Sequence, residues 1–92
     1  MEEIKPYIDD NKGRVSYRTF TKDVSEEELV WHRDPEDRSI KATQNTDWQI
    51  QYDNELPRPL SSSFEYFIPE GVYHRLIKGS GDLNVKIVRH KK

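Results

Sequence analysis

Most of the chain alternates apolar and polar side chains with a period of two rather than with the 3.6-residue period of a helix. The alternation is clear in four stretches, at residues 15–20, 48–53, 64–68 and 83–87. β-Branched and aromatic residues fill these stretches, and such side chains pack well on a pleated, half-buried surface. Alternation of this kind is typical of β-strands with one buried face, so the sequence predicts an all-β domain.

Turn-forming residues separate these stretches. Clusters of Asp, Asn, Gly, Pro and Ser lie at residues 9–13, 34–37, 45–47, 61–63 and 79–82. Pro57 and Pro59 confine their segment to an edge strand or a loop, because proline cannot donate to the hydrogen-bond ladder. Residues 29–33 are interpreted as a further strand. Short strands separated by turns at about every 8–12 residues indicate a sandwich or a barrel.

Length and composition indicate one small domain over residues 1–92. We expect a core at about residues 14–88, a short N-terminal strand and a basic C-terminal tail. A domain of this size buries only about 60–65% of the surface that its unfolded chain exposes, so the core should be thin. Hydrophobic residues make up 33% of the chain and aromatic residues 11%. The candidate core residues are Trp48, Ile50, Tyr52, Phe64, Tyr66 and Ile68.

Charge and residue usage exclude several classes of function. The 15 Lys and Arg residues are scattered and nearly balance the 17 Asp and Glu residues, so no basic face for nucleic acid is expected. The basic run at residues 89–92, which includes His90, is expected to be a frayed, solvated tail. The chain has no cysteine, which excludes disulfides, thiolate nucleophiles and Cys-ligated zinc.

Neither a secretory signal nor a membrane span is visible in the sequence. The first residues lack a basic region followed by an apolar one, and no apolar run approaches the ~20 residues that span a bilayer. We therefore expect a cytoplasmic protein that binds neither membrane nor nucleic acid.

Two segments carry a family resemblance. Residues 68–74, Ile-Pro-Glu-Gly-Val-Tyr-His, resemble the second motif of the cupin superfamily, whose heart is Pro-x-Gly-x-x-His. The proline ends a strand, the glycine permits a tight turn, and the chain re-enters the sheet so that His74 points inward. Residues 32–38 resemble a degenerate first motif, His-x-His followed by Glu four or five residues later. Residues at i and i+2 on a strand share a face, so His32 and Asp34 should both point inward.

The chain departs from the cupin motifs at several positions. Asp34 stands where the second histidine is expected, and Arg38 stands near the expected glutamate. Ser63 and Lys78 replace the usual opening glycine and closing asparagine of the second motif. The resemblance covers about residues 14–88 and implies a single-domain cupin-type β-barrel (a double-stranded β-helix or jelly roll) of about eight strands.

The resemblance also implies a pocket inside the barrel. Cupins often hold a divalent metal with three histidines and a glutamate, and the matching positions here are His32, Asp34, Arg38 and His74. Two histidines and one carboxylate form the facial triad that holds non-haem Fe(II). His32, Asp34 and His74 are therefore the candidate ligands for Fe, Mn, Zn or Ni. Arg38 argues against a metal, because a guanidinium beside a dication is unfavourable unless a carboxylate or an anion lies between them.

Three classes of function stay open, since one fold hosts many activities. In a metal-dependent enzyme, Arg38 would orient an anionic substrate. In a metal-free binding or sensing module, Arg38, His32 and His74 would bind a small anion. In a structural or accessory scaffold, the polar residues would satisfy one another, with Asp34 and Arg38 as a cross-strand ion pair. We expect a pocket for a small molecule, and leave catalysis open.

Residues beside the pocket have simpler interpretations. Trp31 alternates out of phase with His32 and should face away from the pocket, over the outer sheet or in a dimer contact. Arg75 follows His74 and should point outward, where pairing at the surface is the default. We expect a homodimer, because the core is thin, residues 29–31 present apolar side chains on both faces, and small cupins are commonly dimers.

Overall fold

The structure is a computed structural model that describes residues 7–12, 14–25 and 29–90. Within these ranges the chain forms eight β-strands and no helix, as the alternation predicts. No helix in the described ranges is long and apolar enough to cross a bilayer. The strands are β1 (Tyr7–Lys12), β2 (Val15–Phe20), β3 (Asp37–Ala42), β4 (Gln49–Tyr52), β5 (Arg58–Pro59), β6 (Tyr66–Ile68), β7 (His74–Ile77) and β8 (Leu83–His90).

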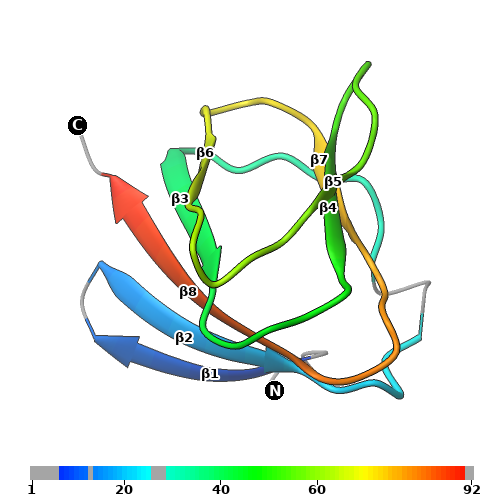
Figure 1. Cartoon of the computed structure of the whole chain (residues 1–92). Helices are drawn as coiled ribbons and strands as arrows, with labels where there is room; N and C mark the ends of the chain where they lie inside the picture. The colour runs from blue at the N-terminus through cyan, green and yellow to red at the C-terminus, as the bar shows by residue number, and fades with distance from the viewer. Residues whose placement is uncertain (1–6, 13, 26–28, 91–92) are drawn as a thin grey trace.

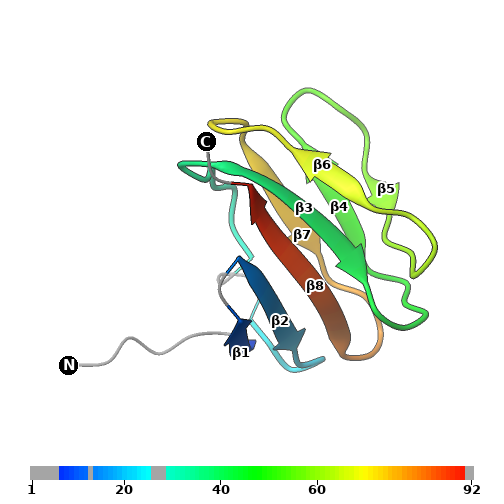
Figure 2. The same cartoon turned by 90° about the vertical axis from the view of Figure 1, so that its left-hand side faces the viewer.

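The strands form two antiparallel sheets that face each other. The five-stranded sheet has the order β1-β2-β8-β3-β6, and the three-stranded sheet has the order β5-β4-β7. In Figure 1 the larger sheet curves along the bottom and left of the molecule, and the smaller sheet stands on the right. In Figure 2 the larger sheet faces the viewer, with β4 and β7 behind it.

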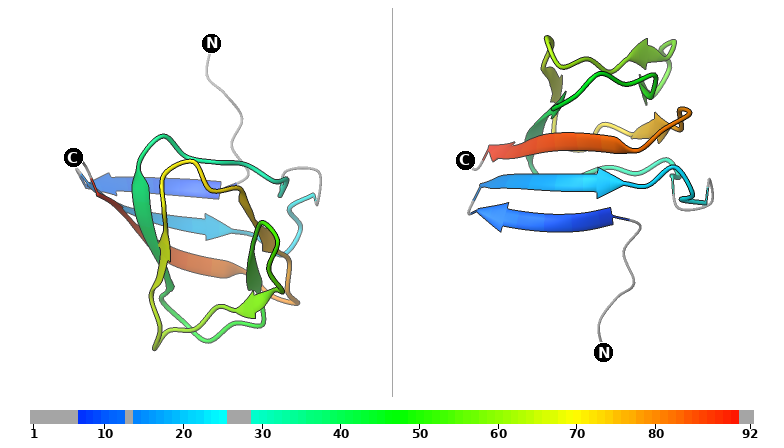
Figure 3. Two further views of the ribbon diagram at one scale, coloured as in Figure 1. Left: turned by 90° about the horizontal axis from the view of Figure 1, so that it is seen from above. Right: turned by 60° about the horizontal axis from the view of Figure 1, so that its bottom comes forward.

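The chain passes back and forth between the sheets after β3, because β4 and β5 belong to the smaller sheet, β6 to the larger, β7 to the smaller and β8 to the larger. β8 therefore pairs with β2 and β3, which lie far from it in the sequence. Figure 3 shows β8, β2 and β1 side by side. This crossing of the chain between two facing sheets is the jelly-roll arrangement that the cupin resemblance implies.

The core lies between the two sheets. Along β8, Leu83, Val85 and Ile87 are buried and alternate with half-buried residues, which is the pattern of a strand with one inward face. Trp48 lies opposite, fully buried, and its indole Nε1–H donates to the carbonyl of Gly81 at 2.7 Å. The buried apolar residues are Phe20, Val24, Ile40, Ala42, Trp48, Ile50, Leu60, Tyr66, Ile68, Leu83, Val85 and Ile87.

Three sequence predictions about strands and core are wrong. Residues 29–33 do not form a strand, since only His32 makes a bridge there, to His74. Phe64 is 54% exposed because it precedes β6, and its ring packs against Tyr66 with centroids 4.7 Å apart. The predicted turn at residues 9–13 is shorter, because β1 continues to Lys12 and pairs there with Val15. The expected edge position of the Pro57–Pro59 segment is confirmed, because β5 is an edge strand.

The predicted frayed tail is also wrong where the structure describes it. Arg89 and His90 belong to β8 and pair with Arg38 and Asp37 of β3. The imidazole Nε2 of His90 lies 2.7 Å from the hydroxyl oxygen of Ser39, so the ring of this histidine is hydrogen-bonded to the protein rather than only to solvent. Residues 91 and 92 lie outside the described ranges, as do residues 1–6 of the proposed domain.

Candidate functional site

Backbone pairing brings two histidines together that are far apart in the sequence. The N–H of His32 donates to the carbonyl of His74 at 3.0 Å, and the N–H of His74 donates to the carbonyl of His32 at 2.9 Å. Such a doubly bonded antiparallel pair places both side chains on one face. The ring centroids are accordingly 4.3 Å apart. His74, at the start of β7, is buried, whereas His32 is exposed.

The Pro-x-Gly-x-x-His segment forms the turn that its sequence predicts. Gly71 has a φ of 78°, in the left-handed region that glycine adopts at little cost. The N–H of Val72 donates to the carbonyl of Pro69 at 3.2 Å and closes the turn. The chain then enters β7 with His74 directed inward, as predicted.

Asp34 links the two motif segments. Its carbonyl accepts a hydrogen bond from the N–H of Gly71 at 3.0 Å. Its carboxylate is buried and has one partner on each oxygen: Oδ1 lies 3.2 Å from Nη1 of Arg38, and Oδ2 lies 3.3 Å from Nε2 of His74. The expected ion pair with Arg38 is therefore present. It is not a cross-strand pair, because Asp34 lies in the loop that precedes β3.

The hydrogen bonds of the two imidazole rings determine which nitrogens carry protons. Nδ1 of His32 lies 3.1 Å from the carbonyl of Val30, and Nδ1 of His74 lies 2.8 Å from the carbonyl of Val72. A carbonyl oxygen only accepts hydrogen bonds, so each Nδ1 is the donor. In a neutral ring the lone pair is then on Nε2, and histidine metal ligands commonly have this arrangement.

Arg38 is held by two carboxylates. Its Nε and Nη2 lie 3.1 and 3.0 Å from Oε2 of Glu36, while Nη1 faces Asp34. Asp34 consequently lies between the guanidinium and His74. This is the arrangement under which an arginine and a dication can share a site, because the carboxylate screens one positive charge from the other.

Asp34 is ionised near neutral pH. Burial raises the pKa of this carboxyl, but the hydrogen bond with His74 and the charge of Arg38, together with the charges of the two histidines, outweigh burial. The net effect lowers the pKa below its usual value. The carboxylate thus accepts a hydrogen bond from Nε2 of His74 when the ring is protonated. When the ring is neutral, Nε2 offers a lone pair to the same space.

The three predicted metal ligands lie together. One candidate ligand atom from each of His32, Asp34 and His74 falls in a group whose members are all within 4.8 Å of one another. Two ligand atoms on one ion, with bonds of about 2.1 Å, are ~3.0–3.4 Å apart at octahedral to tetrahedral angles. The 3.3 Å separation of His74 Nε2 and Asp34 Oδ2 suits that spacing, and the residue types are those that hold divalent metals. His32 completes the set at up to 4.8 Å, so its ring would have to approach the other two to bind the same ion.

A cavity of about 310 Å³ adjoins the cluster, at the lower end of the range of small-molecule sites, about 300–1,000 Å³. His32, Asp34, Arg38 and His74 all line it. The sequence interpretation missed Arg18, which lines it from β2. Arg18 alternates in phase with Phe20, but the alternation alone does not show which face of this strand is buried. The other described lining residues are Phe20, Leu29, Val30, Ile40, Ile50, Ile68, Leu76 and Ile87.

Trp31 and Arg75 lie outside the cavity lining, as expected. The guanidinium of Arg75 lies 4.8 Å from the ring centroid of Trp31, and its Nε donates to Oε1 of Gln51 at 2.9 Å. Beside this pair, the guanidinium of Arg33 lies 5.3 Å from the ring centroid of Tyr73. Residues that flank the two histidines thus form aromatic–arginine pairs away from the cavity.

Comparison with known proteins identifies the fold. No protein-family model matches the chain, and no curated protein matches it either. Solved structures do. A cupin domain from Bordetella pertussis has a TM-score of 0.62 at 18% identity, covering 99% of this chain and all of its own. A conserved protein of unknown function from Streptococcus pyogenes has a TM-score of 0.69 at 15% identity, covering 100% of this chain and 80% of its own.

Larger proteins contain the same fold. A protein from the crystal structures of the DMSP lyases RdDddP and RnDddQII has a TM-score of 0.71 at 10% identity over 84% of this chain. The chain spans only 37% of that protein. The chain therefore has the cupin fold. At these identities the likeness is one of fold, and the function has to be argued from the site.

Proposed function

We propose that the cavity binds a divalent metal through Nε2 of His32, Nε2 of His74 and a carboxylate oxygen of Asp34, and that it accepts a small anionic ligand beside the metal. One observation carries this proposal. Nε2 of His74 and Oδ2 of Asp34 lie 3.3 Å apart, while Nδ1 of the same ring faces the carbonyl of Val72. When the ring is neutral, Nε2 is an acceptor like the carboxylate. Two acceptors at this distance need a cation between them, either a proton on the ring or a metal ion.

Two nitrogens and one carboxylate oxygen suit Fe(II), Mn(II), Zn(II) or Ni(II). Iron has support from one structural neighbour, Fe(II)-HppE in complex with substrate, which has a TM-score of 0.66 at 12% identity. A bound ion with three protein ligands would supply a Lewis acid with open coordination positions. Arg38 would hold the other oxygen of Asp34, which makes it a positioning residue rather than a ligand.

Metal binding is tested with protein purified without chelator or nickel, by elemental analysis and by titration with Zn(II), Mn(II) and anaerobic Fe(II). We expect one equivalent per chain. His74→Ala and Asp34→Ala should each weaken binding by roughly tenfold or more. His90→Ala is the matched control, because His90 contacts Ser39 and Phe67 instead of the cluster. Equal losses in all three variants, or no binding by the unaltered protein, would refute the metal site.

A metal-free binding or sensing module is the second candidate. It is supported by the contacts of Asp34, which Arg38 and a protonated His74 can satisfy without any metal. Under this alternative a small anion raises the melting temperature in the presence of EDTA, since a ligand that binds only the folded state stabilises it by mass action. A protein that responds to neither metals nor anions is a scaffold, and both proposals then fail.

A further inference from the structure

Side chains from both sheets line the cavity. Arg18 lies in β2 of the larger sheet, and His74 lies in β7 of the smaller sheet. Arg18 is paired in register with Val85 of β8, which is buried in the core. Paired residues of antiparallel strands share a face, so the side chain of Arg18 belongs to the inward face. It lines the same cavity as the histidine–aspartate cluster.

The two arginines of the cavity have different surroundings. Arg38 has two carboxylate partners, Asp34 and Glu36. Arg18 also has an interaction of its own in the structure, but a guanidinium has five N–H donors and can take a ligand besides. Among the described lining residues, two are arginines and one is an aspartate. Glu36 offsets the charge of Arg38, and the N–H donors that Arg18 adds to the lining favour a ligand with an anionic end.

The remaining wall limits the rest of that ligand. Aliphatic and aromatic side chains make up the other described lining, including Ile40, Ile50 and Leu76. A volume of about 310 Å³ corresponds to roughly ten water molecules at ~30 Å³ each. A second charge on the body of the ligand would be desolvated against this wall without a partner, which is unfavourable. The cavity thus suits a compact, largely apolar molecule with one anionic end.

We propose that Arg18 anchors the carboxylate of a short aliphatic monocarboxylic acid, whose apolar body lies along the aliphatic wall and whose other end points to the His32–Asp34–His74 cluster. A planar carboxylate matches the fork of a guanidinium through two parallel hydrogen bonds. Arg18, rather than Arg38, is then the residue that selects the charge of the ligand. This inference rests on the proposed function in one respect, that the cavity is a binding site, and it does not require the metal.

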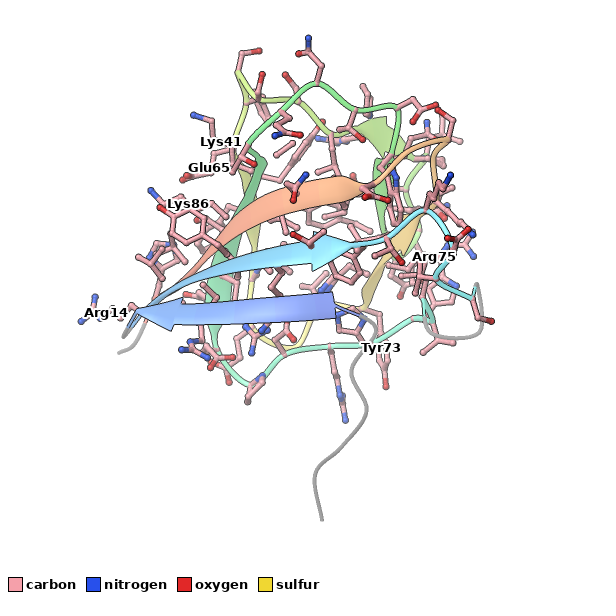
Figure 4. The ribbon with its side chains drawn as sticks, turned by 90° about the horizontal axis from the view of Figure 1, so that it is seen from below. Arg14, Lys41, Glu65, Tyr73, Arg75 and Lys86 are labelled. Atoms are coloured by element: carbon pink, nitrogen blue, oxygen red, sulfur yellow. The ribbon has the colours of Figure 1, made fainter. Side chains whose placement is uncertain are left out.

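The experiment uses straight-chain monocarboxylates from butanoate to octanoate as probes. Binding is measured by calorimetry and by melting temperature in EDTA, and again with saturating Mn(II). The matched alcohols and alkylammonium ions test the requirement for negative charge. Arg18→Gln removes the anchor. Arg14→Gln is the control, because Arg14 is an exposed residue just before β2 and lies in Figure 4 at the opposite end of the molecule from Tyr73 and Arg75, which flank His74.

We expect at least one carboxylate of the series to bind, and Arg18→Gln to weaken it by roughly tenfold or more, equivalent to about 1.4 kcal/mol. Arg14→Gln should change the affinity less than about twofold. Unchanged binding by Arg18→Gln, or no binding across the whole series, overturns the inference. Should Arg18→Gln not fold, Arg18→Lys decides, because it keeps the charge but loses the fork. Weaker binding then supports the anchor, and unchanged binding overturns it.

The metal site and the anchor fail separately. Carboxylate binding that depends on Arg18 in EDTA, in a protein with no metal affinity, supports the anchor and refutes the metal proposal. Metal binding that depends on His74, together with carboxylate binding that Arg18→Gln leaves unchanged, supports the metal proposal and refutes the anchor.

Discussion

Replacing Asp34 separates the two roles that the structure gives this residue. In Asp34→Asn the amide keeps the shape of the carboxylate. Its oxygen can still accept from Arg38, and its NH₂ can donate to the Nε2 of a neutral His74. Both hydrogen bonds therefore survive without the charge. In Asp34→Ala, by contrast, Nη1 of Arg38 and Nε2 of His74 both lose the carboxylate.

The magnitude follows from the number and kind of bonds. A hydrogen bond to a charged group contributes about 1.5–3 kcal/mol, and one between neutral groups about 0.5–1.5 kcal/mol. Two bonds are weakened in Asp34→Asn, but Arg38 keeps Glu36 as a partner. We expect a loss of about 1.5 kcal/mol in the free energy of unfolding, or ~6–12 °C in melting temperature for a domain of this size. Asp34→Ala should lose about 3 kcal/mol, because two polar groups are left unpaired.

The assay is urea unfolding in EDTA, followed by tryptophan fluorescence, since Trp48 is fully buried. The pH dependence gives a second test. The folded-state pKa of Asp34 lies below its usual value of 3.8. Its contribution is therefore present above about pH 4 and is lost as pH falls through the folded-state pKa. The stability gap between the unaltered protein and Asp34→Asn should narrow at low pH. Equal costs for the Asn and Ala variants, or a gap independent of pH, would contradict this account of Asp34.

Three further predictions concern the surrounding fold. Burial raises the pKa of Tyr52 to about 12 from 10.0. The contribution of Tyr52 to stability should therefore be constant below pH 10 and fall by about 1–2 kcal/mol as pH rises towards 12, and Tyr52→Phe should remove that loss in urea titrations. A Cβ at Gly79 would collide with the carboxylate of Asp47 and with the indole ring and backbone N of Trp48, whereas Gly81 has open space. Gly79→Ala should therefore cost about 1–3 kcal/mol in thermal unfolding and Gly81→Ala much less. A double-mutant cycle on Trp31 and Arg75 should give a coupling energy of about 0.5–1 kcal/mol, and an energy of zero would show that their contact is incidental.

The fold was predictable where the alternation of side chains was long and one face was buried. Residues 15–20 and 83–87 lie within strands of the larger sheet. The segment at residues 29–33 was not predictable in this way. Its apolar residues are not part of a hydrogen-bonded strand. Leu29 and Val30 line the cavity, and Trp31 packs with Arg75. Phe64 was wrongly predicted to lie in the core, because the alternation of side chains cannot show at which residue a short strand begins.

The candidate site was predictable to the extent that motifs fix local geometry. The glycine turn placed His74, and the i, i+2 spacing placed His32 and Asp34 near each other, although Asp34 is not in a strand. That residues 32–38 and 68–74 lie together in space was predicted only from the cupin resemblance, because the spacing of residues along the chain does not require it. Arg18 was missed because parity relates it to Phe20 without saying which face is buried. The Glu36 contact depends on the conformation of a loop, which the sequence does not specify.

The departures from the first cupin motif are coupled to one another in this structure. The position near the expected glutamate holds Arg38, and the carboxylate instead comes from Asp34, in the same segment as His32. Because Arg38 engages one oxygen of that carboxylate, the other is turned toward His74. In the proposed metal site, Arg38, which first argued against a metal, would orient a ligand for one, and Glu36 offsets its charge. A proton and a metal ion would compete for the same Nε2 lone pair, so the proposed metal site predicts that metal affinity weakens as His74 becomes protonated.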